Sequence, residues 1–337
     1  MEKILTIVIP TYNMQDYLSR CLDSLIVPEE QMKQLEVLVV NDGSKDNSSA
    51  IAHEYQDKYP DTFRVIDKEN GNYGSCVNKG IVKATGKYFK ILDADDWYNT
   101  GALEYTLKVL MVIDVDMVIT RFRTYYELKN KNVDSLSFDG LKTNFIYNKG
   151  EGEFETIDFY RYIGMHKVAY RTTLLKKIGL KLQEGISYTD NEYAYYPFEH
   201  INSVIFLNEV LYTYWIGREG QTVTPEVMAK RSWQLYKIID RMLDKYKANK
   251  DKAVHKFQYQ YLANTCAMYY HLELMVNEAS QERNKQMKNL DNKIKSIDLD
   301  LYNQIPKCSQ RGSIIKFWRL FPYKFVSLFY SKLKCLN

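Results

Sequence analysis

Several features that would point to a familiar class of protein are missing from this sequence. Its 337 residues include only five cysteines, which are Cys21, Cys76, Cys266, Cys308 and Cys335. No two of them form a CxxC pair, so they indicate neither a disulfide framework nor a zinc site, and a reducing compartment fits best. A GxGxxG fingerprint and a P-loop are also absent, which disfavours a dinucleotide-dependent dehydrogenase and a P-loop kinase.

Long hydrophobic runs are missing as well. The first apolar run, residues 4–9, is too short for the core of a signal peptide, and Pro10 follows it at once. No apolar stretch is long enough to span a bilayer. Hydrophobic residues still make up 45% of the chain, enough for a sizeable core. We therefore expect a cytoplasmic protein of about two domains, or one large domain with an appendage.

Acidic residues become scarce toward the C-terminus. Residues 1–228 contain 25 Lys and Arg against 33 Asp and Glu, whereas residues 229–337 contain 21 against 9. From residue 301 onward there are seven basic residues and no acidic one. This asymmetry indicates an anionic partner for the C-terminal part, either membrane lipid or nucleic acid.

The first 120 residues alternate short apolar strands with amphipathic helices. The predicted strands cover residues 5–9, 36–40, 63–66, 88–92 and 116–120, and the predicted helices cover residues 15–26, 47–59, 73–83 and 101–112. This alternation predicts an α/β fold with a mostly parallel sheet flanked by helices. In such sheets, ligands bind at the carboxyl ends of the strands.

The remaining residues have a different pattern. Residues 121–225 are mixed and rich in tyrosine, with short strands predicted at 203–207 and 210–214 and a helix near 190–198. From residue 226 onward the pattern is mainly helical, with helices predicted at 228–247 and 254–276. We place a domain boundary near Pro225.

Three carboxylates lie within four positions directly after the predicted strand at residues 88–92. They are Asp93, Asp95 and Asp96. Carboxylates this close repel one another unless a cation lies between them, and their oxygens suit Mg²⁺ or Mn²⁺ together with the phosphates of a substrate. The pattern predicts a metal–diphosphate site. Asp-rich turns also occur without a metal, since Asp96 could cap a helix that begins near Thr100.

Polar loops at residues 10–13, 41–44 and 70–74 follow the other strands, so four loops converge on one rim. In order and spacing, these segments resemble family-2 inverting glycosyltransferases of the GT-A fold. The resemblance rests on residues 6–13, 36–44, 70–80, 86–88 and 93–96, and it covers residues 3–120 strongly and 160–222 more weakly. It implies a Rossmann-like catalytic domain over residues 1–225, with a nucleotide-binding half at 1–120 and an acceptor half at 121–225. The helical, basic extension at 226–337 lies outside it.

The resemblance also implies roles for individual residues. Tyr12 would stack on the nucleotide base, Asp42 would accept a hydrogen bond from a base such as uracil, and Asp93 would lie near the ribose. Asp95 would hold a divalent metal, Mn²⁺ or Mg²⁺, that bridges the diphosphate and neutralises the leaving group. The residues implied in nucleotide-sugar binding are Pro10, Thr11, Tyr12, Asn13, Asp42, Asn78, Asp93 and Arg218.

One departure from the family concerns the phosphate contacts. Family members often carry Ala-Arg-Asn before the glycine that corresponds to Gly80, but this chain has no arginine there. Lys68 or Lys79 could supply the missing positive charge, or both could be solvated surface lysines.

The resemblance places the catalytic base at the start of a helix, where residues 186–192 fit. Asp190 would take the proton from an acceptor hydroxyl, and direct attack would invert the anomeric centre. Asp190 could instead cap the helix, and Glu192 is its nearest rival as base.

Two further segments contain weaker candidates. His166 could contact the acceptor, supply a third metal ligand or be structural. Residues 214–222 correspond to a mobile loop that closes over the diphosphate in family members, where Arg218 suits the diphosphate through its planar fork and Gln221 is a weaker candidate. The alternative for this segment is an ordinary exposed turn.

Residues 312–330 interleave basic residues with large aromatic ones. This composition is typical of a segment that lies in a membrane interface. The alternatives are a helix packed on the core and a dimer contact, and the aromatic content disfavours nucleic acid.

These observations predict a metal-dependent, inverting transferase that moves a sugar from a nucleoside-diphosphate sugar, in first place a UDP-sugar, to a hydroxyl of a saccharide acceptor. We expect a lipid-linked acceptor, a role in cell-surface polysaccharide synthesis and a peripheral position on the inner face of the plasma membrane. One alternative is a nucleotidyltransferase, which would usually need a Gly-rich loop with Lys or Arg after the first strand. The other is a non-catalytic sugar-nucleotide-binding protein.

Overall fold

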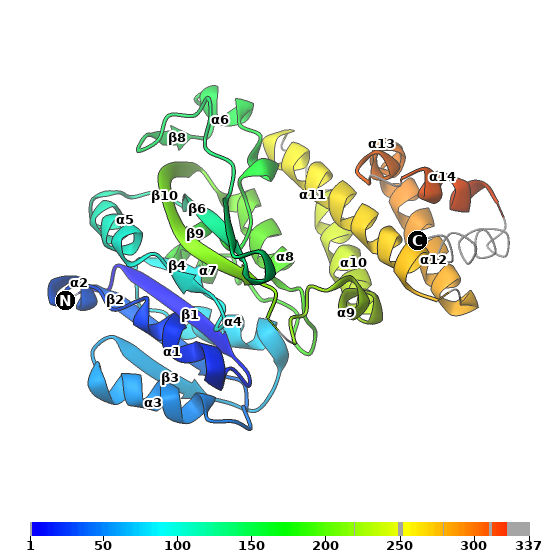
Figure 1. Cartoon of the computed structure of the whole chain (residues 1–337). Coiled ribbons are helices and arrows are strands. Elements are labelled where there is room, and N and C mark those ends of the chain that lie inside the picture. Colours follow the sequence, from blue (N-terminus) through cyan, green and yellow to red (C-terminus); the bar gives the residue numbers. More distant parts are fainter. Residues whose placement is uncertain (1, 219, 249–251, 279, 310–311, 322–337) are drawn as a thin grey trace. The chain divides into compact units, whose positions relative to one another are not determined.

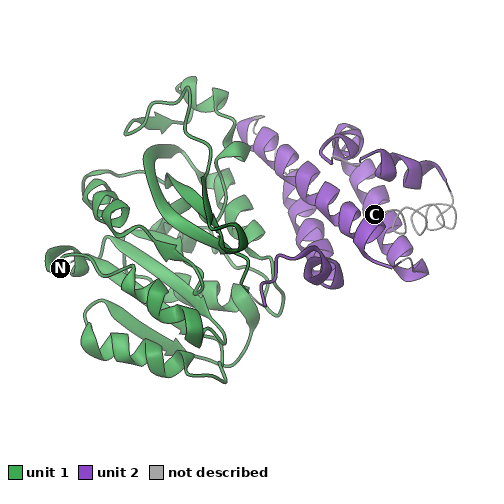
Figure 2. Ribbon diagram, in the orientation of Figure 1, with its two compact units in different colours: residues 1–219 green, residues 220–337 purple. Residues whose placement is uncertain are grey.

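The computed structural model describes residues 2–218, 220–248, 252–278, 280–309 and 312–321. It divides into two compact units, residues 1–219 and residues 220–337, which Figure 2 shows in different colours. The first unit contains the sheet, and the second is helical.

Ten strands form one sheet in the first unit (Figure 1). Eight of them follow the order β3-β2-β1-β4-β9-β6-β10-β5, while β7 pairs with β6 and β8 pairs with β10. The strands are β1 (Leu5–Thr11), β2 (Leu35–Asn41), β3 (Phe63–Asp67), β4 (Tyr88–Ile91), β5 (Trp97–Tyr98), β6 (Met117–Tyr126), β7 (Lys131–Asp134), β8 (Ile146–Asn148), β9 (Val168–Arg171) and β10 (Ser203–Ile216).

The half of the sheet formed by β3, β2, β1 and β4 is parallel, as the sequence predicts. Its helices are α1 (Gln15–Asp23), α2 (Glu29–Met32), α3 (Ser48–Lys58), α4 (Asn72–Lys83) and α5 (Thr100–Val112). The helix α4 packs closely on β1 because Gly80 has no side chain: a Cβ there would lie 2.5 Å from Val8 Cγ2. Parallel pairing brings the carboxyl ends of the four strands, and the loops that follow them, to one edge.

The other half of the sheet differs from the prediction. The strand β9 runs antiparallel between β4 and β6. The two short strands expected at residues 203–207 and 210–214 are one strand, β10, whose register shifts between Leu207 and Tyr212. A bulge interrupts the alternation of side chains without ending the strand, which explains the apparent break in the sequence pattern.

The helices of this half are short. They are α6 (Glu153–Thr156), α7 (Thr172–Lys177) and α8 (Asp190–Tyr195), with 3₁₀ turns at Glu127–Lys129, Phe159–Arg161 and Pro197–His200. The helix expected at residues 190–198 ends at Tyr195 because Pro197 lacks the N–H that would continue the α-helical bonds.

The second unit is helical, as predicted from residue 226 onward. Its elements are α9 (Pro225–Lys230), α10 (Ser232–Ala248), α11 (Lys252–His271), a π-helical turn (Leu272–Val276), α12 (Gln281–Ile297), α13 (Leu299–Gln304), a 3₁₀ turn (Ile305–Lys307) and α14 (Ser313–Leu320). Its core contains fully buried side chains such as Ile238, Met242, Leu262 and Ile294. Within the described part of the chain, no helix is both long enough and apolar enough to cross a membrane.

The helix α14 covers part of the segment 312–330, for which the sequence left a membrane interface and packing on the core as alternatives. Trp318 is fully buried, and its indole N–H donates to Asn284 Oδ1 at 2.9 Å. Arg319 forms an ion pair with Asp291 at 2.6 Å. Both side chains therefore belong to the packed interior of the second unit rather than to a membrane-facing surface. Residues 322–330 lie outside the described residues.

Candidate active site

The acidic turn after β4 holds its three carboxylates in different environments. Asp96 is fully buried and accepts hydrogen bonds from the Tyr212 hydroxyl at 2.6 Å and from the Trp215 amide at 2.8 Å. Burial raises the pKa of Asp96 well above its usual range. Asp96 therefore fastens the turn to β10 and does not cap α5. Asn99 is the cap, since its Oδ1 accepts the Ala102 amide at 3.0 Å.

Asp95 forms a largely buried ion pair with Arg218, whose Nε lies 2.5 Å from Asp95 Oδ2. The Arg218 guanidinium carbon also lies 5.0 Å from the centroid of the Tyr17 ring. The structure thus brings together Asp95, which is expected to bind the metal, and Arg218, which is expected to bind the diphosphate. Gln221 is buried and belongs to the second unit.

His166 lies in an aromatic setting next to the acidic turn. Its ring stacks on Phe122 with centroids 5.3 Å apart and lies 4.7 Å from the ring of Tyr214. Burial, together with the positive charges of Lys90 and Lys167, lowers the pKa of His166 to about 3. The imidazole is therefore neutral, which is the form that binds a metal.

Asp93, Asp96 and His166 converge, with one potential ligand atom from each lying within 4.8 Å of the others. Two carboxylates and a neutral imidazole suit Mn²⁺ better than Mg²⁺, because Mg²⁺ prefers oxygen ligands alone. Burial and the nearby Asp95 charge raise the pKa of Asp93 to about 8. A cation at this point would relieve that repulsion, so the residues fit a divalent metal. The expected ligand Asp95 is bound to Arg218 and lies outside this cluster of three.

A second buried carboxylate lies at the end of β2. Asp42 Oδ1 accepts from the Lys68 ammonium at 2.6 Å and from the Gly71 amide at 2.9 Å. Lys68 also donates to Ser75 Oγ at 2.9 Å. Lys68 therefore brings its positive charge to the predicted base-binding acid, whereas Lys79 is exposed on α4.

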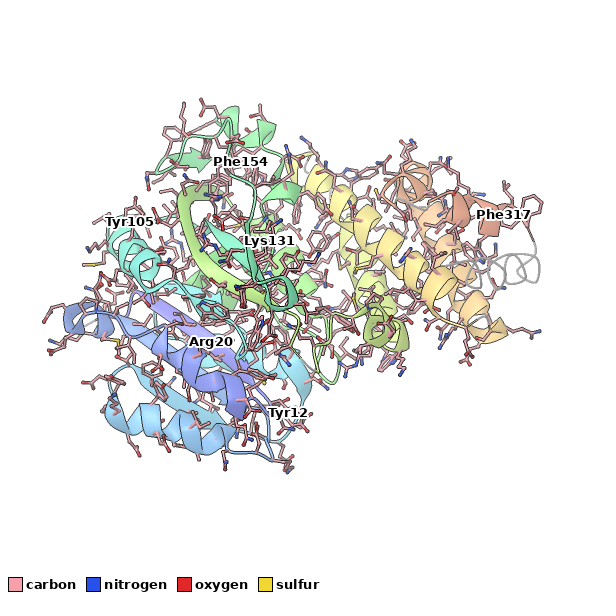
Figure 3. The ribbon with its side chains drawn as sticks, in the orientation of Figure 1. Tyr12, Arg20, Tyr105, Lys131, Phe154 and Phe317 are labelled. Atoms are coloured by element: carbon pink, nitrogen blue, oxygen red, sulfur yellow. The ribbon has the colours of Figure 1, made fainter. Side chains whose placement is uncertain are left out.

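The loop after β1 joins this region. Tyr12 directly follows β1 and is 46% exposed (Figure 3). Asn13 adopts a left-handed φ of 54°, and its Oδ1 accepts the Lys45 amide at 2.8 Å, which ties the loop after β1 to the loop after β2. Pro10 is the penultimate residue of β1. The Thr11 hydroxyl is buried and donates to the Ile9 carbonyl at 3.1 Å.

Asn78 braces the segment that leads to the predicted base. Its Nδ2 donates to the Leu182 carbonyl at 2.9 Å and to Glu184 Oε1 at 2.9 Å, while its Oδ1 accepts the Leu182 amide at 2.8 Å. The hydrogen-bonding groups of Asn78 are thus engaged within the protein, and its predicted contact with the donor would have to replace one of these bonds.

Asp190 is the first residue of α8. Burial raises its pKa to about 6, although the amides of Asp190 and Asn191 oppose the shift by hydrogen bonding to the carboxylate. Two residues earlier, Tyr188 has a φ of 64°, a left-handed conformation that bulky residues rarely adopt and that is frequent at functional sites. The rival Glu192 is fully buried and accepts from the Gln183 amide at 2.7 Å and from Gln183 Nε2 at 3.0 Å, so it braces the loop.

Sequence reasoning missed several side chains of the site. Tyr73 and Tyr212 contact the acidic turn, with the Tyr73 hydroxyl donating to Asp93 Oδ1 at 3.1 Å. Lys90 is 1% exposed and donates to the carbonyls of His166 and Val168 at 3.0 and 3.2 Å. Burial lowers the pKa of Lys90 to about 7. The sequence feature that could have identified Lys90 is its position as a single lysine within an apolar strand, because a buried lysine needs hydrogen-bond acceptors nearby.

The parallel half-sheet, the mixed second half and the acidic turn at the carboxyl edge define the GT-A fold. S. aureus TarS 1–349, crystallised in complex with UDP-GlcNAc, superposes with a TM-score of 0.66 at 18% identity, over 98% of this chain and 92% of that one. A mannosyltransferase of Pyrobaculum calidifontis, in complex with GDP-Man and Mn²⁺, superposes with a TM-score of 0.54 at 14% identity, over 97% and 86% of the two chains. The fold expected from the sequence is confirmed.

Residues 6–179 match the family model of glycosyl transferase family 2, and the chain belongs to this family. An uncharacterized glycosyltransferase of Rickettsia typhi is 35% identical over 214 residues, which are 62% of this chain and 62% of that protein. The chain therefore spans less than two thirds of the length of this relative.

Proposed function

We propose that this protein is a metal-dependent glycosyltransferase that moves a sugar, with inversion, from a UDP-sugar to a hydroxyl group of a saccharide. The observation that carries the proposal is a convergence of buried carboxylates at one edge of the sheet. The acidic turn and Asp190 come from different elements, yet the charge of Asp190 contributes to the raised pKa of Asp93. Carboxylates gathered in this way suit a cation, a diphosphate and a proton acceptor.

The nucleotide is assigned to the loops after β1 and β2. The exposed ring of Tyr12 provides a stacking face, and Asp42 provides a buried acceptor for a base N–H. Lys68 at 2.6 Å from Asp42 is the positive charge that replaces the absent arginine. The UDP-GlcNAc complex of S. aureus TarS supports uridine as the nucleoside.

The metal is assigned to Asp93, Asp96 and His166, with Asp95 as a further ligand candidate. When bound, a divalent cation neutralises the charge that develops on the leaving nucleoside diphosphate. Arg218 offers a second positive charge through a planar fork that matches phosphate oxygens. The Mn²⁺ complex of the P. calidifontis mannosyltransferase supports the choice of cation.

Asp190 is assigned as the general base. A carboxylate with a pKa of about 6 is ionised at neutral pH and is a stronger base than an ordinary aspartate. It takes the proton of the acceptor hydroxyl as the oxygen attacks the anomeric carbon, and a single displacement inverts that centre. The engagement of Glu192 with Gln183 supports Asp190 over its rival.

The acceptor is assigned to lipid-linked saccharides at the inner face of the plasma membrane, in the synthesis of cell-surface polysaccharides. The basic C-terminal part of the sequence supports this assignment, since cations are attracted to anionic lipid. The burial of Trp318 and Arg319 leaves residues 322–337 as the part of the tail to test.

The experiment that tests the function measures nucleotide release from UDP-, GDP- and dTDP-sugars with Mn²⁺ or Mg²⁺. Asp190→Asn removes the base, and Asp139→Asn is the matched control at an exposed loop position. Metal-dependent release from UDP-sugars that is lost in Asp190→Asn alone would support the proposal. Failure of every nucleotide sugar to bind, with or without metal, would overturn it.

A further inference from the structure

Arg20 of α1 lies between two tryptophan rings (Figure 3 labels this residue). Its guanidinium carbon is 3.9 Å from the centroid of the Trp97 ring and 4.1 Å from that of Trp215. The two indole rings are 6.4 Å apart at an angle of 70°. A planar guanidinium is attracted to an aromatic face, and here it contacts two. Because Trp97 belongs to β5 and Trp215 to β10, one arginine joins three elements.

The same helix also contacts the backbone of the acidic turn. Arg20 Nη2 donates to the Asp95 carbonyl at 2.9 Å, and the Cys21 thiol lies 3.6 Å from the Asp93 carbonyl. Two carbonyl groups of the turn are therefore bound by α1. The side chains of the same two residues are the ones assigned to the metal and the donor.

Trp215 connects this arrangement to Arg218. The Trp215 amide donates to Asp96, and its ring meets Tyr17 edge-on with centroids 5.4 Å apart. Tyr17 in turn lies 5.0 Å from the Arg218 guanidinium. Arg218 follows Trp215 by three residues, and both side chains contact the same ring of Tyr17.

We propose that Arg20 is a positioning residue for the donor site. Stacked between Trp97 and Trp215, it holds the acidic turn against the end of β10, so that Asp95 and Arg218 reach the same ligand. The role rests on the proposed function of the site. It depends on the planar shape of the guanidinium as well as on its charge, because the two indole faces and the Asp95 carbonyl are contacted by one flat group.

The test compares Arg20→Met, Arg20→Lys and a matched control, Arg64→Met. Arg64 lies near the amino end of β3, at the opposite edge of the sheet, and its side chain is 47% exposed where it pairs with Glu36 at 3.5 Å. Each variant is measured for kcat and KM with a UDP-sugar and Mn²⁺, for thermal unfolding, and for acrylamide quenching of tryptophan fluorescence. Trp97 and Trp215 are two of the four tryptophans, and the exposed Trp233 is common to all variants, so a difference in quenching between variants reports on the stack.

We expect Arg20→Met to lower kcat/KM about 10- to 100-fold, the usual effect of removing a group that orients the ligands of a site, and to increase acrylamide quenching. Arg20→Lys should lose most of the same activity, and Arg64→Met should match the unmodified protein in kcat, KM and quenching. A lysine variant with full activity would overturn the inference, because it would mean that charge alone suffices.

Unaltered kinetics and quenching in Arg20→Met would also overturn it. A fall in thermal stability with unchanged kcat and KM would assign Arg20 a purely structural role and would overturn the inference as well. Failure of the unmodified protein to bind any nucleotide sugar would instead overturn the proposed function, and this positioning role with it.

Discussion

The Nε of Arg218 donates to Oδ2 of Asp95 at 2.5 Å, although 123 residues separate the two in the chain. The guanidinium therefore holds the carboxylate that is expected to bind the metal. A cation and a guanidinium compete for the same negative charge. Binding of a metal–diphosphate complex would release Asp95 to the cation and offer Arg218 the phosphate oxygens in its place.

Replacing Arg218 by methionine should therefore change metal affinity and turnover in opposite directions. Without the competing charge, we expect Mn²⁺ to bind the donor-free protein about tenfold more tightly, measured by electron paramagnetic resonance of free Mn²⁺. Transfer from the UDP-sugar should fall, because the diphosphate loses a partner. Arg123→Met is the matched control, since it breaks an ion pair of 2.6 Å with Asp134 on β7. Weaker Mn²⁺ binding in Arg218→Met would contradict the competition.

His166 gives a second prediction, for the metal itself. In His166→Phe the new ring keeps the stacking with Phe122 and Tyr214 but provides no nitrogen. We expect Mn²⁺ affinity to fall at least about tenfold, with thermal stability close to that of the unmodified protein. His200→Phe, at an exposed position, is the control. Unchanged Mn²⁺ affinity in His166→Phe would make the histidine a packing residue only.

The parallel half of the sheet could be predicted from sequence because its signals are local. Apolar runs predict β1, β2 and β4. Asn41 and Asp42 mark the end of β2, and the acidic turn follows the end of β4. The helix α4 starts one residue from its predicted position. Each of these elements is determined by periodicity and by polar residues within a few positions along the chain.

The parts that could not be predicted depend on distant contacts. The position of β9 is set by pairing with Tyr88 and Phe89, about eighty residues away. A pattern of neighbouring residues in the sequence does not predict such a pairing. The contacts that distinguish Asp95 from Asp96 in the acidic turn likewise come from distant residues. They are made by Tyr212, Trp215 and Arg218, which lie more than a hundred residues later. Adjacent aspartates look equivalent in sequence, and only tertiary contacts distinguish Asp96, hydrogen-bonded to Tyr212 and Trp215, from Asp95, paired with Arg218.

The C-terminal tail gives a prediction about the membrane. Residues 322–337 contain three lysines and no acidic residue, and each lysine near an anionic surface contributes about 1 kcal/mol. Removing these residues should weaken sedimentation with phosphatidylserine vesicles about 100-fold, while thermal unfolding stays unchanged because Trp318 and Arg319 remain in place. Phosphatidylcholine vesicles are the control for charge. Equal sedimentation of the full chain and the shortened chain would show that the tail does not contribute to membrane binding.

Asp190 makes the pH dependence of the reaction a test of its role. Its pKa of about 6 lies above the ordinary value because burial penalises the charged form. Asp93, Tyr73 and Tyr214 are the titratable groups that interact with it, and Asp93 is the one that a metal would keep ionised. With saturating Mn²⁺, we expect kcat/KM to be constant at neutral pH and to fall about tenfold per unit below pH 6, as the base becomes protonated. A flat profile between pH 5 and 8 would contradict this assignment.

Stability provides an independent check on the same carboxylate. A pKa raised on folding means that the folded protein binds a proton more readily than the unfolded chain, so this group costs stability as pH rises from about 4 to 6. Asp190→Asn removes that cost and keeps an oxygen for the amides of Asp190 and Asn191. The variant should therefore unfold at a higher temperature than the unmodified protein at pH 7, with the difference shrinking toward pH 4. It should bind the donor yet transfer no sugar, whereas equal stability at both pH values would show that the carboxylate is not desolvated.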